Sequence, residues 1–164
     1  MKLLVYLLAA LSTLSCQEDK MIKLERNGFS ISYPSHLTLD ESGQEGTSFV
    51  LTTQKSGQND VFVENINLVI KNVGKTSLDE FSKRTENEIS TVANIIESNR
   101  LKINGKDCFK LVLEATQNNV DLTFVQHYYL ENQKVYLLTF SSETKVYYDY
   151  YNDMNTVLTS FEIK

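Results

Sequence analysis

Hydrophobic and polar residues alternate along much of this chain with the two-residue period of β-strands. The first two such stretches, residues 22–25 and 29–33, flank Asn27-Gly28, a pair typical of hairpin turns. Residues 36–40, 48–53 and 60–73 continue the pattern as further strands. The stretch 60–73 has apolar residues on both faces, so we expect an inner strand that is covered on both sides.

A helical spacing replaces this alternation after Ser77. Ser77 and Glu80 have the spacing of a capping box, in which each side chain binds the other residue's backbone N–H. Leu78, Phe81, Ile89, Val92 and Ile96 recur at helical intervals, which predicts a helix that ends within residues 94–99.

A strand meander and a second helix are predicted for the remainder. Asn104-Gly105, residues 117–119 and residues 131–134 are turn signals that separate strand-like stretches, the last of which is residues 135–140. Ser141 or Ser142 then suits the cap of a helix that carries Met154 and Leu158 on its inner face. The order of strands, helix, meander and helix predicts an α+β domain on a mostly antiparallel sheet.

The amino-terminal sixteen residues have a different character. Lys2 precedes nine apolar residues, 3–11, which as a helix would span about 14 Å and are too short to cross a membrane comfortably. This pattern is typical of a cleaved signal peptide. The run Thr13-Leu14-Ser15-Cys16 resembles the lipobox of bacterial lipoproteins, which implies cleavage before Cys16 and its lipidation. An uncleaved signal anchor and ordinary secretion are the alternatives.

The resulting division is a signal peptide at 1–15, a lipidated cysteine with a short tether at 16–21, and one domain at 22–164. We expect the protein to be lipid-anchored in the bacterial cell envelope, in the outer membrane, facing either the periplasm or the outside. Several acyl chains together give stable anchoring, whereas a single chain gives only marginal binding. Cys108 is then the one thiol left, and we expect a small apolar side chain in a strand.

Composition and charge narrow the range of functions. A content of 41% hydrophobic and 23% charged residues is ordinary for a globular domain. The net charge of -5 argues against nucleic-acid binding, which needs clustered Lys and Arg. No cysteine or histidine spacing suggests a metal site, and the acidic residues Asp40, Glu41 and Glu45 lack the regular spacing of calcium ligands. We therefore assign no cofactor.

Six short segments, in order, resemble the PsbP and Mog1-like superfamily, which includes bacterial members of unassigned function. They are Phe29-Ser30-Ile31-Ser32-Tyr33-Pro34, Ser77-Leu78-Asp79-Glu80-Phe81, Ile103-Asn104-Gly105-Lys106, Tyr128-Tyr129-Leu130, Val135-Tyr136-Leu137-Leu138-Thr139-Phe140 and Ser160-Phe161-Glu162-Ile163. The resemblance covers roughly residues 24–164. It implies an α/β/α sandwich with a central, mostly antiparallel sheet flanked by helices. The best-known relatives are not enzymes but dock onto other proteins, in photosystem assembly or with a nuclear transport GTPase.

The candidate binding residues are four tyrosines at the start of the second helix, Tyr147, Tyr148, Tyr150 and Tyr151. They cannot all face one core, because successive residues of a helix differ by about 100°. We expect Tyr147 and Tyr151 to pack inward and Tyr148 to face solvent or a partner. Tyrosine is enriched at binding surfaces, although simple cover for the sheet is the alternative reading of this segment.

No catalytic residue is assigned. Neither His36 nor His127 has a carboxylate or second histidine at a spacing that suggests a site, and no serine-nucleophile or phosphate-loop motif occurs. We expect a non-enzymatic module that docks onto another envelope protein; a carrier of a small apolar ligand is the alternative. A hydrolase or metalloenzyme would need one of the histidines within hydrogen-bond reach of a carboxylate or serine. Neither the oligomeric state nor the partner follows from the sequence.

Overall fold

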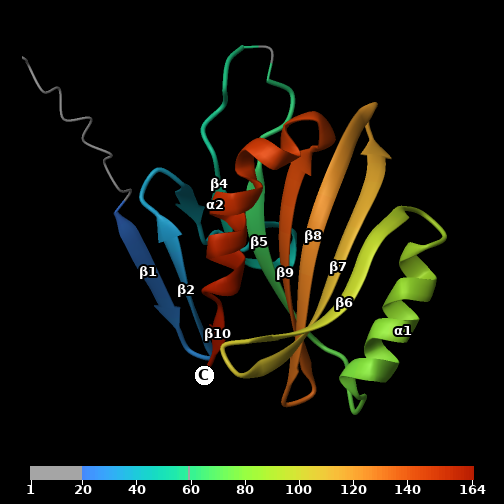
Figure 1. Ribbon diagram of the computed structural model, residues 1–164. Helices are drawn as coiled ribbons and strands as arrows, with labels where there is room; N and C mark the ends of the chain where they lie inside the picture. The colour runs from blue at the N-terminus through green and yellow to red at the C-terminus, as the bar shows by residue number, and fades with distance from the viewer. Residues whose placement is uncertain (1–19, 59) are drawn as a thin grey trace, which may run out of the picture.

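A seven-stranded antiparallel sheet forms the centre of the molecule (Figure 1). The computed structural model describes residues 20–58 and 60–164. In spatial order, the strands of this sheet are β3 (Thr38–Asp40), β4 (Thr47–Thr52), β5 (Asn65–Asn72), β9 (Lys134–Glu143), β8 (Val120–Glu131), β7 (Lys106–Gln117) and β6 (Asn94–Ile103). A smaller sheet has the order β1 (Met21–Arg26), β2 (Phe29–Pro34) and β10 (Glu162–Ile163).

Tight turns join the four strands from β6 to β9. Each has two central residues with positive φ: Asn104 and Gly105, Asn118 and Asn119, and Asn132 and Gln133. Positive φ at both central positions matches the right-handed twist of the flanking strands, and Asn and Gly tolerate it best. These positions fall within the turn signals that the sequence predicts, so all three hairpins are confirmed.

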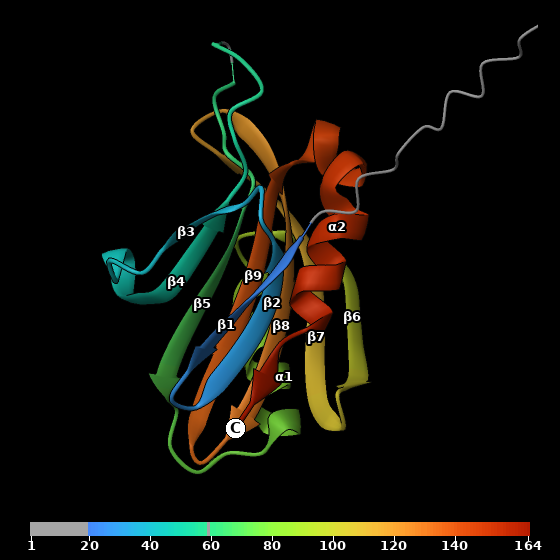
Figure 2. The same ribbon diagram turned by 90° about the vertical axis from the view of Figure 1, so that its left-hand side faces the viewer.

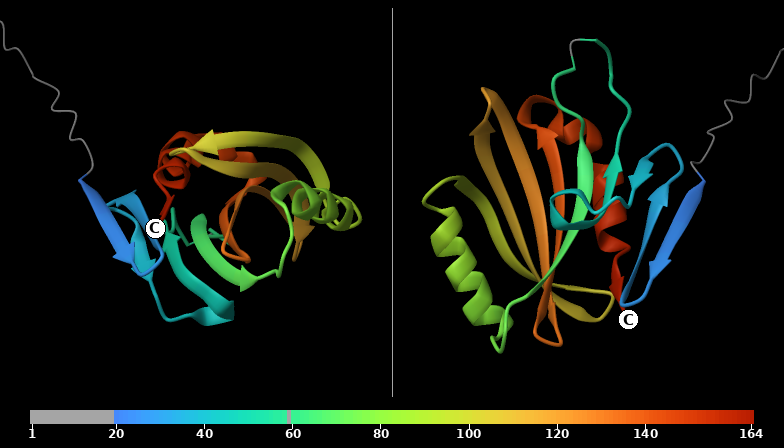
Figure 3. Two further views of the ribbon diagram at one scale, coloured as in Figure 1. Left: turned by 90° about the horizontal axis from the view of Figure 1, so that it is seen from below. Right: turned by 180° about the vertical axis from the view of Figure 1, so that it is seen from behind.

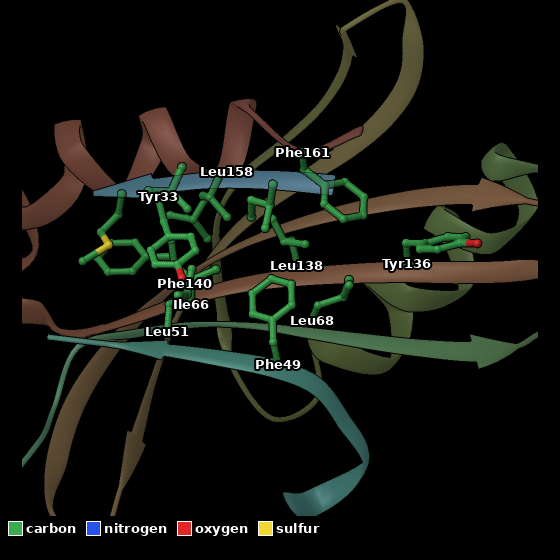
Figure 4. Packing of buried hydrophobic residues seen from close by; sticks show 14 of the residues in the cluster. Tyr33, Phe49, Leu51, Ile66, Leu68, Tyr136, Leu138, Phe140, Leu158 and Phe161 are labelled. Atoms are coloured by element: carbon green, nitrogen blue, oxygen red, sulfur yellow. The ribbon is translucent and has the colours of Figure 1, made fainter. Parts of the chain in front are cut away.

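The main core lies between the seven-stranded sheet and a second layer made of α2 (Tyr147–Thr159) and the smaller sheet (Figure 2). Figure 4 shows the side chains that meet there, among them Phe49, Leu138, Phe140, Leu158 and Phe161. Each of these five side chains is at most 1% exposed. Helix α2 is therefore held by apolar packing, and Met154, Val157 and Leu158 form its buried stripe.

Helix α1 (Leu78–Ile89) packs on the opposite face of the seven-stranded sheet. Its Phe81 joins a second apolar cluster with residues of β7, β8 and β9, including Phe109, Leu111 and Tyr128. Figure 3 shows α1 on one side of the sheet and the smaller sheet on the other. The layers agree with the predicted class: an α+β fold with a mostly antiparallel sheet and helices on both faces. The sequence does not predict the separate three-stranded sheet.

Helix α1 begins as predicted but ends earlier. The Ser77 hydroxyl accepts a hydrogen bond from the backbone N–H of Glu80, and the Glu80 carboxylate accepts one from the N–H of Ser77, which confirms the capping box. The predicted extension through Val92 to Ile96 is wrong, because residues 94–103 form β6. The β-branched residues Ile95 and Ile96 favour a strand, and pairing with β7 satisfies its backbone.

Two other predicted boundaries are also wrong. The stretch 60–73 contributes only Asn65–Asn72 to the sheet, because Asp60 instead closes a loop by accepting hydrogen bonds from the backbone N–H groups of Ser56 (2.8 Å) and Phe62 (3.2 Å). Strand β5 is an inner strand, as expected, but Asn65 and Asn67 make its second face partly polar. Ser141 and Ser142 cap no helix; they lie within β9.

Candidate functional site

Helix α2 starts where β9 has carried the chain to one end of the sheet. After β9, a short 3-10 turn (Thr144–Val146) leads into the helix, and Val146 occupies the N-cap position without a side-chain hydrogen bond. The predicted caps, Ser141 and Ser142, lie upstream in β9, and the first turn of the helix packs its aromatic residues against the main core. That packing determines where the four candidate tyrosines point.

Three of the four tyrosines form one ring cluster. Tyr147 stacks on Phe140 of the sheet with ring centroids 6.1 Å apart, and it contacts Tyr151 at 5.2 Å and Tyr148 at 5.1 Å. Tyr147 and Tyr151 are half-buried against the main core, whereas Tyr148 is 84% exposed. Burial raises the pKa of the Tyr147 hydroxyl. We call Tyr147, Tyr148 and Tyr151 the tyrosine surface.

Tyr150 lies apart from the tyrosine surface. It packs partly on the main core and lines a hollow of about 510 Å³ between the start of α2 and the loop before β5. Residues 148 and 150 differ by about 200° around a helix, so they face in different directions. The structure thus divides the four candidates, which sequence reasoning treated as one docking surface, into two settings.

The hollow beside Tyr150 is strongly acidic. Its lining includes the carboxylates of Asp60, Glu64, Glu143 and Asp149 and one cation, Lys145. We call it the acidic hollow. Sequence reasoning missed it, because residues 60–64 and 143–149 are distant along the chain and no motif links them. An alternating strand pattern gave no sign that Glu64 would be buried.

Two of these carboxylates are buried in the wall of the acidic hollow. Glu64 is only 4% exposed, and one of its carboxylate oxygens accepts a long hydrogen bond (3.4 Å) from the backbone N–H of Glu143. Burial raises the pKa of Glu64, although hydrogen bonds from the backbone oppose this shift. The Lys145 ammonium lies 2.6 Å from a Glu143 carboxylate oxygen, and this contact raises the pKa of Lys145. Charge in the hollow is therefore partly compensated within the chain.

The acidic side chains that were considered as metal ligands can be located in the structure. Within residues 20–58 and 60–164, no group of three or more His, Cys, Asp or Glu side chains is arranged to hold a metal ion. Asp40 instead accepts a hydrogen bond from the Ser42 N–H (2.7 Å), and Glu41 pairs with Arg26. These acidic side chains serve local structure.

His127 is buried in the middle of β8. It is 1% exposed, neither ring nitrogen has a hydrogen-bond partner, and its ring meets Tyr129 edge-on at 6.4 Å. Burial lowers its pKa to about 4; nearby Lys110 adds to this shift and Glu97 opposes it. A histidine without a carboxylate or serine in hydrogen-bond reach is not arranged as a base or ligand.

Of the two cysteines, Cys108 lies within the residues that the structure describes and Cys16 does not. Cys108 is fully buried in the main core, as expected of a small apolar side chain, and burial raises the pKa of its thiol to about 12. Cys16 and the predicted signal peptide lie outside the described residues. No helix of the described chain has the length and apolar character needed to cross a membrane.

Comparisons with known proteins agree with this fold. The model of the PsbP family matches residues 21–163. The solution structure of cyanobacterial PsbP (CyanoP) from Synechocystis sp. PCC 6803 is similar, with a TM-score of 0.63, 14% identity, and coverage of 92% of this chain and 96% of that one. No curated protein sequence matches the chain significantly.

Two other solved structures share the architecture. LpqN from Mycobacterium tuberculosis, described as involved in cell envelope biogenesis, has a TM-score of 0.67 and 12% identity over 90% of this chain and 92% of that chain. PA94 from Pseudomonas aeruginosa, a protein of unknown function described as a putative regulator, has a TM-score of 0.62 and 10% identity over 85% and 94%. At these identities the likeness establishes the fold alone.

Proposed function

Since the chain belongs to the PsbP family, we propose that it is a non-enzymatic docking module, held in the bacterial cell envelope by lipid on Cys16. The apolar run that ends in Cys16 supports the anchor. The description of LpqN, a structural neighbour, as a protein of cell envelope biogenesis supports the location. The partner in this proposal is another protein of the envelope.

The exposure of Tyr148 is the observation that supports docking most strongly. Its ring is 84% exposed, yet it rests edge-on against Tyr147, which is itself stacked on core residue Phe140. A tyrosine offers a large amphipathic contact area and loses little side-chain entropy when it binds. Attachment of the ring cluster to the core lowers that cost further, because Tyr147 is already ordered. The tyrosine surface is thus suited to a protein partner.

A carrier of a small apolar ligand has less support. Ligand pockets for such molecules are lined mainly by apolar side chains, whereas charged residues dominate the acidic hollow. Another hollow, of about 560 Å³, lies between the start of α1 and the β8–β9 turn and is also lined largely by polar residues. Neither offers the contiguous apolar wall that an apolar ligand requires.

Photo-crosslinking from Tyr148 tests docking. A benzophenone amino acid would replace Tyr148 in the full chain, and crosslinked products from intact envelopes would be identified by mass spectrometry. The matched control carries the same group at Val92, which is 79% exposed in the turn between α1 and β6. We expect one or a few proteins captured from position 148 and not from position 92. Equal capture from both positions contradicts docking through this surface.

A Cys16→Ser variant tests the anchor separately. We expect loss of lipid labelling and release of the protein from the membrane fraction, because serine offers no thiol for the lipid. Cys108→Ala is the control, since Cys108 is buried in the domain, and this variant should remain lipidated and membrane-bound. Lipid labelling that persists in Cys16→Ser rules out Cys16 as the site.

A further inference from the structure

The first strand of the domain starts with two exposed apolar side chains. Met21 is 46% exposed and Ile22 is 39% exposed, although both belong to β1 and pair with Pro34 and Tyr33 of β2. Leu24, two residues after Ile22, is buried in the main core. The apolar exposure is therefore confined to the beginning of the strand.

Met21 and Ile22 point to opposite faces of the smaller sheet, because side chains alternate along a strand. A partner that covers one face of the sheet would therefore bury only one of them. The side chains of Met21 and Ile22 are covered together only if the end of the strand is surrounded on both faces. An apolar layer that this end enters fits that requirement better than a flat protein surface.

The distance to Cys16 determines what can lie next to this end. Five residue steps separate Cys16 from Met21, and a fully extended chain spans about 17 Å over that length. A domain of this size has a radius of gyration of about 14 Å, so the tether is shorter than the domain is wide. If lipid on Cys16 lies in a bilayer, as the proposed function requires, the start of β1 stays close to that bilayer.

We propose that Met21 and Ile22 insert into the interfacial region of the lipid bilayer and fix the domain with the start of β1 toward the membrane. This inference rests on the proposed lipid anchor. The contact is apolar rather than electrostatic, because the two positive charges of Lys20 and Lys23 are balanced by the two negative charges of Glu18 and Asp19. Helix α1, on the far side of the seven-stranded sheet, then faces away from the membrane (Figures 2 and 3).

Fluorescent labels on the native lipidated chain test the proposal. Cys108 is buried and its thiol has a raised pKa, and the sulfur of a lipidated Cys16 is blocked, so a cysteine introduced by Ile22→Cys or Met21→Cys is the reactive thiol. Each variant would carry an environment-sensitive dye and be reconstituted in phosphatidylcholine vesicles that contain a lipid with a quencher near its headgroup. Val92→Cys is the control, because Val92 is exposed in the turn that joins α1 to β6 and does not belong to the smaller sheet.

We expect dyes at positions 21 and 22 to lose most of their fluorescence to the lipid-borne quencher and the dye at 92 to keep it. Equal fluorescence at all three positions overturns the proposal. Protection from a water-soluble quencher in native envelopes, without quenching by lipid, indicates a covering protein and also overturns it. The intact mass of each sample separates the two failures: absence of lipid refutes the anchor, whereas a lipidated sample without quenching refutes only membrane contact.

Discussion

The ring of Tyr148 stands edge-on to the ring of Tyr147, with centroids 5.1 Å apart and an interplanar angle of 70°. Through this contact, an exposed side chain is supported by one that stacks on Phe140 of the core sheet. Edge-to-face pairs of aromatic rings contribute on the order of 1 kcal/mol beyond their buried area. Helix α2 thereby presents a positioned ring to solvent, which gives the proposed docking surface a defined centre.

Replacement of Tyr148 should weaken docking and leave the fold intact. In Tyr148→Ala we expect a loss of about 2 kcal/mol in binding to the partner captured by crosslinking, a typical value for an exposed aromatic anchor at an interface. The free energy of unfolding should fall by only about 1 kcal/mol, because the edge-to-face contact with Tyr147 is lost while the core stays intact. Binding would be measured by titration and stability by urea unfolding. Val92→Ala is the matched control, and a loss of binding as large in that variant contradicts a specific role for Tyr148.

The buried His127 should make stability depend on pH. Its folded-state pKa of about 4 lies below the ordinary value of 6.5, so the unfolded chain binds the proton more readily. The stabilising effect of the neutral ring is complete above pH 6.5 and is lost as pH falls toward 4. Over this range the free energy of unfolding falls by roughly 3 kcal/mol.

The variant His127→Leu isolates this effect, because leucine fills similar space and does not titrate. Urea unfolding at a series of pH values from 7 to 4 should show a shallower loss of stability for the variant than for the natural chain. The surrounding charges of Lys110 and Glu97 are retained in both proteins, so they do not account for the difference. Parallel stability profiles would falsify this assignment.

The capping box of α1 should contribute measurably to stability. Ser77→Ala removes the acceptor for the Glu80 N–H, and the loss of such a cap costs about 1 kcal/mol. The control is Ser90→Ala at the other end of the helix, where the hydroxyl donates to the carbonyl of Asn87 in an exposed position. Thermal unfolding should show a clearly lower Tm for Ser77→Ala and little change for Ser90→Ala; the reverse order is inconsistent with the cap.

Cys108 should be unreactive in the folded protein. The thiolate is the reacting species, and burial both shields the sulfur and raises its pKa to about 12. A thiol reagent at pH 8 should therefore modify Cys108 only after denaturant unfolds the domain, as followed by mass spectrometry. Rapid labelling under native conditions would mean that β7 opens locally near Cys108.

Local signals in the sequence predict the parts of the fold that depend on neighbouring residues. The Asn-Gly turn at 104–105 and the Ser77–Glu80 cap form as expected because a few adjacent groups determine their geometry. The predicted end of α1 is wrong because Val92 and Ile96 continue a helical spacing in the sequence. Their actual state depends on pairing between β6 and β7, which sequence spacing does not reveal.

The candidate site was predicted only in part for the same reason. The inward direction of Tyr147 and Tyr151 and the outward direction of Tyr148 follow from helical periodicity, and the structure shows both. The setting of Tyr150 in the acidic hollow depends on Glu64, which is brought there by β5. Contacts of that kind arise from tertiary packing and leave no local pattern.

The intact mass of the natural protein, extracted from membranes, tests the central claim most directly. In the proposed account, lipid on Cys16 keeps the tyrosine surface in the envelope, where the proposed partner is, and brings the start of β1 to the bilayer. The account predicts the mass of residues 16–164 plus a diacylglycerol on the cysteine and a further acyl chain on its amino group. The mass of the uncut, unmodified polypeptide would contradict it.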